Sequence, residues 1–326
     1  MNLNKKYIIS IDMGGTKILA ALINSEEGIV KRLKKPTVTG CGGDAYVKSL
    51  SQTVFDIIAE AGIDQGQVLA VCLGVPGSVN PFTGIIAMAP NLGLNNYCIK
   101  DELGKLIPYP VLIENDVNLG ALGVKHYGLG KAAKDMLVVF IGTGIGAGFI
   151  FDDKLFRGAD YAAGEIGHIK VKKNGPLCGC GNHGCFEAVA SRTAIDRDIK
   201  KDLKKGVQSV LKEYAASDKQ IKSKILADAV RKGDKLAIKH LTKACRTIGM
   251  VLADITNLLN LDLIILGGGV IEALDKFMLP VIKESFYESA LPSSSRGLEL
   301  LPTKLGDDAA LYGGIRLAEE FLQIKI

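Results

Sequence analysis

The hydrophobic positions of the chain alternate between short continuous runs and segments with helical spacing. Residues 7–12 and 18–23 are apolar runs on either side of a glycine turn, which predicts a strand, a tight turn and a second strand. Residues 44–62 carry apolar side chains at helical spacing, and 68–75 and 110–114 predict two more buried strands. Strands that alternate with helices in this way indicate the α/β class.

The opening pattern is repeated near the middle of the chain. Residues 136–141 are apolar, Gly142–Gly144 form a turn, and residues 147–151 are apolar again. Two similar hairpins favour two related domains that face one another across a cleft, although the pattern alone leaves two unrelated hairpins as an alternative. Further along, residues 186–260 are predicted to be mostly helical.

Two elements are expected toward the end of the chain. Strand 262–266 leads directly into Gly267, Gly268 and Gly269. Bare backbone at that point can approach an adenine or a ribose, and a structural turn is the alternative. Asp307 is predicted to cap a final helix over roughly 308–323.

The composition and the charge limit the classes of function that the chain can have. A length of 326 residues predicts two domains, and 48% hydrophobic with 23% charged residues is ordinary for a globular protein. The net charge of +5 is small and scattered, and the lysines at 200–205 and 218–223 read as solvated helix faces, so no nucleic-acid partner is expected. The chain shows no secretory pattern and no run near the roughly 18 apolar residues of a membrane span. We therefore expect a cytoplasmic protein with no membrane partner.

The first glycine turn has the residues of a phosphate site. Gly14 and Gly15 let backbone N–H groups approach an anion, and Thr16 and Lys17 add a hydroxyl and a cation. Asp12, at the end of the preceding strand, is a candidate ligand of Mg²⁺. The spacing is not that of a Walker A loop, and a plain hairpin turn is the alternative.

The second glycine turn, within residues 142–148, matches the G-x-G-x-x-A pattern of dinucleotide sites, and Glu165 lies near the expected distance for a ribose contact. A dinucleotide site needs a helix after the glycines, but residues 148–151 continue as a strand. We therefore interpret this turn as a second phosphate site in which Thr143 and Gly144 offer donors.

Polar residues follow the strand at 110–114. Asp116 can accept a proton from a hydroxyl without an unusual pKa, and Asn115 can bind sugar hydroxyls. A turn with an Asn or Asp cap is the alternative.

Three cysteines and a histidine form the strongest local motif. His168 is followed by Cys178, Cys180 and Cys185, with glycines between the cysteines. Three thiolates and one imidazole suit a closed tetrahedral Zn²⁺ site, which would be structural because no coordination position stays open. His183 is a competing ligand. Free thiols are the alternative, whereas the C-x-C spacing does not favour a redox pair.

Taken in order, these motifs resemble the ROK family of repressors and sugar kinases across essentially the whole chain, most distinctively from Ile141 to His168. The resemblance implies an actin-like ATPase fold, with two ribonuclease-H-like domains and a central cleft. The expected domains are a small one of residues 1–118 plus 309–326, and a large one of residues 119–308 that carries the zinc motif.

The resemblance also implies an activity, ATP-dependent phosphorylation of the 6-hydroxyl of a hexose, and a set of site residues. Asp116 is the implied general base. The implied sugar-binding residues are Asn91, Asn115, Asp116, Glu165, His168 and Glu187. The implied nucleotide-binding residues are Asp12, Gly14, Gly15, Thr16, Lys17, Thr143, Gly144, Gly267, Gly268 and Gly269. The implied cofactors are ATP, Mg²⁺ and a structural Zn²⁺, with one nitrogen of His168 on the zinc and the other toward a sugar hydroxyl.

Within the family the chain is most similar to bacterial glucokinases, through Gly74–Gly77 and Ala89–Gly93, so D-glucose is the first expected sugar. Leu94 departs from the Trp that those enzymes often carry. Kinases for N-acetylmannosamine, N-acetylglucosamine, mannose, fructose or allose are the alternatives. A repressor would carry a DNA-binding extension, for which the eleven residues before Asp12 give no room, and a dehydrogenase is a further alternative. The resemblance implies a homodimer or homotetramer.

Overall fold

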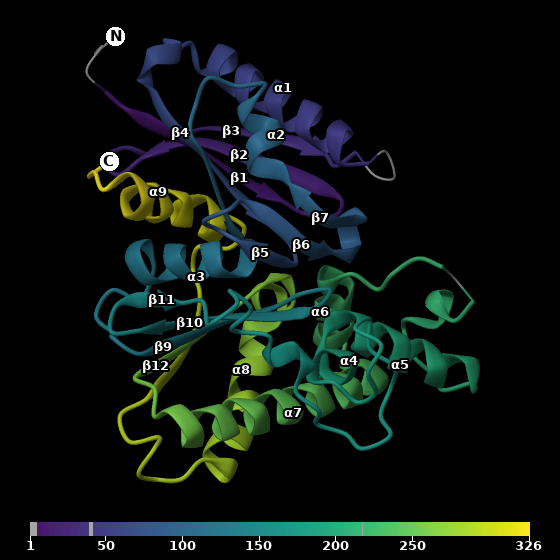
Figure 1. Ribbon diagram of the computed structural model, residues 1–326. Helices are drawn as coiled ribbons and strands as arrows, with labels where there is room; N and C mark the ends of the chain where they lie inside the picture. Colours follow the sequence, from purple (N-terminus) through teal and green to yellow (C-terminus); the bar gives the residue numbers. More distant parts are fainter. Residues whose placement is uncertain (1–4, 39–41, 217) are drawn as a thin grey trace. The chain divides into compact units, whose positions relative to one another are not determined.

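The computed structural model describes residues 5–38, 42–216 and 218–326 (Figure 1). Its contacts divide the chain into two compact units. The first comprises 1–132, 148–163 and 307–326, and the second comprises 133–147 and 164–306. The domain boundaries expected from the sequence, 1–118 with 309–326 and 119–308, stay a prediction.

The first unit is built on a five-stranded sheet in the order β3-β2-β1-β4-β8. The strands are β1 (Tyr7–Met13), β2 (Lys17–Asn24), β3 (Gly28–Pro36), β4 (Val68–Val75) and β8 (Val111–Asn115). β1, β2 and β3 are antiparallel neighbours, whereas β4 runs parallel to β1 and β8 parallel to β4. The central strands are buried on both faces, as their continuous apolar runs require.

Helices cover both faces of this sheet (Figure 1). One core joins Ile9 and Ile11 of β1 to Val54 and Ile57 of α1 (Gly43–Ala61). The other core lies under α9 (Asp308–Leu322) and α3 (Asp116–Tyr127). These two helices touch through glycines, because a Cβ on Gly123 would lie 1.8 Å from the carbonyl oxygen of Ala309. The unit also contains α2 (Ile99–Gly104) and a small antiparallel sheet of β5 (Ser78–Asn80), β6 (Ile85–Ala89) and β7 (Leu94–Cys98).

The second unit holds three parallel strands in the order β9-β12-β13. They are β9 (Met136–Ile141), β12 (Leu263–Gly267) and β13 (Glu299–Pro302). Its helices are α4 (Phe186–Ala190), α5 (Arg192–Lys204), α6 (Ser223–Arg231), α7 (Lys235–Leu259) and α8 (Gly269–Ser289). β10 (Ile145–Phe151) begins in the second unit and ends in the first, where it pairs antiparallel with β11 (Lys154–Phe156).

The predicted α/β class and the predicted strands at 7–12, 18–23 and 68–75 are confirmed. The prediction for Asp307 was wrong in part. The helix is present, but the Asp307 side chain caps no backbone N–H and pairs instead with Lys17. No helix in the described part of the chain is long and apolar enough to cross a membrane.

Candidate functional site

The first glycine turn joins β1 to β2 and is held mainly by its backbone. The N–H of Gly14 donates to the Lys17 carbonyl at 2.9 Å, and the Thr37 hydroxyl donates to the Gly14 carbonyl at 2.6 Å. A Cβ on Gly15 would lie 3.7 Å from the side chain of Asn91. The structure therefore brings Asn91, an expected sugar residue, next to the expected phosphate turn.

Carboxylates gather beside this turn. Burial and the charge of Asp116 raise the pKa of Asp12 from 3.8 to about 7, with Lys17 opposing the shift and Asp307 adding to it. A carboxylate that is held from water next to another carboxylate favours its protonated form. A hard cation would relieve this repulsion, since oxygen atoms are the ligands that Mg²⁺ prefers. The donor set at this turn therefore fits the expected ion.

Asn115 and Asp116 lie where β8 ends and α3 begins. The side chain of Asn115 caps α3 by accepting the N–H groups of Val117 and Asn118, and its amide donates to the Gly77 carbonyl at 3.0 Å. The alternative interpretation as a cap therefore describes Asn115 correctly. Asp116 accepts the Val117 N–H at 2.9 Å, and both side chains remain half-buried.

A buried ion pair beneath these residues was not foreseen. Glu114 is only 1% exposed and accepts the N–H of Asn115 and the side-chain amide of Asn118. Its other oxygen accepts from Arg157 at 2.7 Å, and Arg157 also binds Glu320. This pair fixes the backbone that presents the predicted base. No local sequence pattern predicts this ion pair, because Arg157 is 43 positions from Glu114 along the chain.

The second glycine turn closes on its own backbone, with the Gly142 N–H donating to the Gly144 carbonyl at 2.9 Å, and is also held by residues at the start of α5. The backbone N–H of Arg192 donates to the Gly142 carbonyl at 3.0 Å, and its guanidinium donates to the Thr143 hydroxyl at 2.8 Å. The hydroxyl of Thr193 donates to the Thr143 carbonyl at 2.8 Å. Arg192 thus places a cation beside a predicted phosphate turn, and the sequence analysis missed it. A strand, β10, follows the turn, as predicted.

Glu187 connects this turn to the cysteine motif. One oxygen accepts the Ile145 N–H at 2.9 Å, and a Cβ on Gly144 would lie only 2.2 Å from that oxygen. The other oxygen lies 3.9 Å from the Cys178 sulfur. Position 144 therefore has to be glycine for Glu187 to occupy its place.

The four predicted metal ligands come together. The ligand atoms of His168, Cys178, Cys180 and Cys185 all lie within 4.8 Å of one another. The Cys180 and Cys185 sulfurs are 3.7 Å apart, and Nδ1 of His168 is 3.6 Å from the Cys178 sulfur. Tetrahedral zinc with Zn–S bonds of about 2.3 Å needs sulfur separations of roughly 3.8 Å, so the cluster fits this ion.

The neighbouring histidine and glutamate lie in different places. Nδ1 of His183 lies 3.1 Å from the Gly175 carbonyl, outside the group of four. Nε2 of His168 lies on the other side of its ring from the cysteines, 3.7 Å from Glu165. Both Glu165 and His168 are exposed, so both can reach a ligand.

The glycines after β12 open α8. Gly268 has a φ of +87°, and a Cβ there would lie 2.6 Å from the Ile141 carbonyl oxygen. The first turn of α8 has no side-chain cap, so its N–H groups remain available. The segment Gly267–Gly269 thus packs on the strand that precedes the second glycine turn.

The chain is similar to known proteins over nearly its full length. It is 31% identical to a glucokinase of Thermotoga maritima, over 97% of this chain and 98% of the relative. It is 32% identical to a glucokinase of Halalkalibacterium halodurans, over 96% and 94%. Similarity to repressors also occurs, with 28% identity to a xylose repressor of Caldicellulosiruptor bescii over 95% of this chain and 77% of the relative.

Solved structures of ROK family proteins are also similar to this chain. A ROK family glucokinase from Streptomyces griseus in complex with glucose and AMPPNP superposes with a TM-score of 0.82 at 31% identity, over 96% of this chain and 99% of that one. A ROK family transcriptional regulator, a homologue of the E. coli MLC protein, gives 0.86 at 26% identity, over 98% and 79%. The expected actin-like ATPase fold is confirmed. The ROK family profile matches residues 8–321, and the chain belongs to the ROK family.

Proposed function

We propose that this chain is an ATP-dependent kinase that phosphorylates the 6-hydroxyl of a hexose, with D-glucose as its first substrate. The observation that carries the proposal is that the charge of Asp116 acts on Asp12 beside a glycine turn, in a chain similar along its length to glucokinases. One similar structure holds both glucose and an ATP analogue.

Each proposed sugar residue has a chemical role. Asn91, Asn115, Glu165, His168 and Glu187 hold sugar hydroxyls. Asp116 accepts the proton of the attacking hydroxyl, a role that a carboxylate performs in kinases. Glu114 and Arg157 act as positioning residues, because they hold the end of β8 from which Asp116 projects.

The proposed nucleotide residues divide between the two glycine turns and Gly267–Gly269. Backbone N–H groups of Gly15 and Gly144 bind phosphate oxygens, together with Thr16, Lys17 and Thr143, whereas Gly14, whose N–H closes the turn on Lys17, lets the backbone approach the phosphate. Arg192 joins this set because its guanidinium already contacts Thr143. Mg²⁺, held by Asp12, supplies charge neutralisation on the transferring phosphoryl group when it is bound.

A structural zinc ion in the cluster of His168, Cys178, Cys180 and Cys185 is part of the proposal. Zinc there ties His168 and Glu187 to one rigid loop, since both lie against Cys178. We expect about one zinc per purified chain by elemental analysis. Cys180→Ser should lose it, whereas Cys98→Ser, at a cysteine outside the cluster, should retain it. Equal zinc content in the two variants contradicts the site.

The preferred sugar is tested by ADP release across a panel of glucose, mannose, fructose, allose, N-acetylglucosamine and N-acetylmannosamine. Leu94 is 5% exposed within the core of the first unit, so packing accounts for that residue. We expect glucose to give the highest kcat/KM and the product to carry its phosphate on the 6-oxygen. A higher value for an N-acetyl sugar would reassign the substrate, and ADP release with none of them would contradict the kinase. The homodimer or homotetramer, tested by light scattering, and the cytoplasmic location stay predictions.

A further inference from the structure

A pocket of about 310 Å³ lies in the second unit, apart from every residue assigned to sugar or nucleotide. Its walls come from α4, from α5 and the residue that follows it, from α7, and from the loop that precedes the cysteines. Six cationic side chains line it: Lys172, Arg197, Lys201, Lys205, Lys239 and Lys243. With two carboxylates in the wall and His240 neutral, its lining carries a net charge of +4, against +5 for the whole chain. The pocket thus gathers six basic side chains around two carboxylates.

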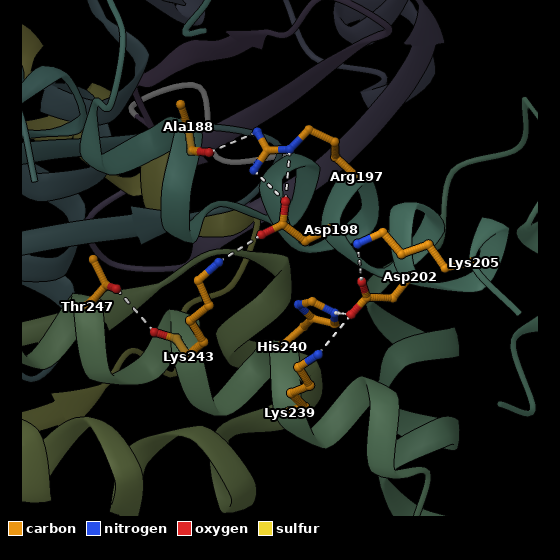
Figure 2. A network of polar contacts seen from close by, with 9 residues as sticks. All are labelled: Ala188, Arg197, Asp198, Asp202, Lys205, Lys239, His240, Lys243 and Thr247. Carbon is orange, nitrogen blue, oxygen red and sulfur yellow. Dashed lines mark hydrogen bonds and ion pairs between the residues drawn. The ribbon is translucent and has the colours of Figure 1, made fainter. Parts of the chain in front are cut away.

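The two carboxylates are already occupied by cations of the wall. Asp202 accepts from Lys239 at 2.9 Å and from Nε2 of His240 at 3.0 Å (Figure 2). Asp198 binds Arg197, with a shortest distance of 2.7 Å, and Lys243 at 3.0 Å. The hydrogen bonds from Lys239 and His240 lower the pKa of Asp202 to about 2, so it is ionised at neutral pH. Neither carboxylate is left to neutralise a further lysine.

Two cations of the wall have no such partner. Lys172 and Lys201 form no ion pair within the described residues. Lys201 lies one helical turn from Arg197 and one from Lys205, so three cations follow one another at i, i+4 and i+8 on the pocket face. Like charges at this spacing repel one another. An anion in the pocket would remove that repulsion.

We propose that this pocket is a second ligand site, which binds a small molecule carrying a phosphate group with at least two negative charges. Lysine is a common phosphate ligand in proteins, acting as a point charge. The volume is at the lower end of the roughly 300–1,000 Å³ found for ligand pockets, which suits a small phosphate compound. The site lies on the helix whose first residue, Arg192, holds the second glycine turn. It is nevertheless independent of the proposed kinase reaction, because none of its lining residues belongs to that reaction.

The test is the binding of labelled pyrophosphate to the full chain, measured by equilibrium dialysis. Saturating glucose and a non-hydrolysable ATP analogue occupy any kinase site during the measurement. The double variant Lys172→Gln/Lys201→Gln removes the two unpaired cations. The double variant Lys173→Gln/Lys204→Gln makes the same charge change at neighbouring exposed lysines that do not line the pocket.

We expect the wild-type chain to bind pyrophosphate under these conditions, the first variant to bind it at least tenfold more weakly, and the second variant to match the wild type. Competition of inorganic phosphate and of glucose 6-phosphate with the labelled pyrophosphate then shows whether the pocket prefers a free phosphate or a sugar phosphate as its ligand. Absence of binding to the wild type, or equal weakening in both variants, would overturn the site. ADP release by the same preparations reports the kinase separately, so the two proposals fail or stand independently.

Discussion

The two glycine turns look alike in the sequence but are supported differently in the fold. The turn at Gly14–Lys17 closes on its own backbone and lies among carboxylates, of which Asp12 has a raised pKa. The turn at Gly142–Gly144 also closes on its own backbone, through the Gly142 N–H and the Gly144 carbonyl, but it is held in addition by Arg192 and Thr193 and lies beside Glu187. The comparison teaches that one local pattern can serve two tasks. Both turns are proposed to bind phosphate, but the first lies beside carboxylates that suit a cation, whereas the second lies beside the guanidinium of Arg192.

The largest expected effect concerns Asp116, the proposed proton acceptor beside the first turn. Asp116→Asn keeps the size of the side chain and removes its ability to take a proton, so we expect kcat to fall by about 10²- to 10⁴-fold. The KM for glucose should change little. Coupled ADP-release kinetics measure both quantities. Turnover near that of the wild type would assign the base elsewhere.

The next effect is a pH dependence specific to the first turn. The pKa of Asp12 is raised from 3.8 to about 7 on folding, chiefly by burial and by Asp116. The folded chain therefore holds this proton more tightly than the unfolded chain, and the contribution of Asp12 to the free energy of unfolding falls as the pH rises from about 4 to 7. The variant Asp12→Asn has no titrating carboxyl at this position, so its free energy of unfolding should not show this fall with pH.

Thermal unfolding of the wild type and of Asp12→Asn, from pH 5 to pH 8, measures this effect. As the pH rises across that range, we expect the Tm of the variant to rise relative to that of the wild type. The change should correspond to a difference in the free energy of unfolding on the order of 1–3 kcal/mol. Adding Mg²⁺ at pH 8 should stabilise the wild type more than the variant. A constant difference in Tm would show that Asp12 titrates near its ordinary pKa.

A smaller effect distinguishes the glycines of the two turns. A Cβ at position 144 would meet Glu187 at 2.2 Å, whereas at Gly15 the nearest atoms are 3.7 Å away and at Gly142 none lies within 4 Å. The Glu187 carboxylate can shift to make room, so Gly144→Ala should lower the free energy of unfolding of the ligand-free chain by about 1 kcal/mol, mainly through the lost hydrogen bond to the Ile145 N–H. Gly15→Ala and Gly142→Ala should each change it by less than about 1 kcal/mol. Similar losses in all three would contradict the packing described for Glu187.

The smallest effect compares the cations of the two turns. Arg192→Met removes a hydrogen bond that holds Thr143, and we expect a loss of about 1 kcal/mol in the ligand-free chain. Lys17→Met removes an exposed pair with Asp307, for which about 0–1 kcal/mol is typical. Urea unfolding of both variants makes the comparison. A greater loss of stability for Lys17→Met than for Arg192→Met would contradict the inference that the Arg192 side chain supports the second turn.

Sequence reasoning succeeded where the signal is local. The strands at 7–12 and 18–23 follow from continuous apolar runs, and the group of His168 with three cysteines follows from glycine-separated ligands close in sequence. It failed where partners are distant. Arg192 lies 49 positions from Thr143, and Arg157 lies 163 positions from Glu320, so no window of sequence contains either pair.

The same limit explains the error at Asp307. A residue of that type before a helix predicts a cap, but Lys17 lies close enough in the fold to attract the carboxylate. The pocket between α5 and α7 follows the same rule. Its lysines look like a solvated helix face in the sequence, and only the packing of α7 against α5 shows that several of them share one cavity.

The most direct test of the central claim is amide hydrogen exchange on the full chain, with and without a non-hydrolysable ATP analogue and Mg²⁺. The claim is that both glycine turns hold the phosphates of one nucleotide. It predicts slower exchange at Gly14–Lys17 and at Gly142–Gly144 together, at the same analogue concentration. Slower exchange at one turn alone, or at neither, would contradict it.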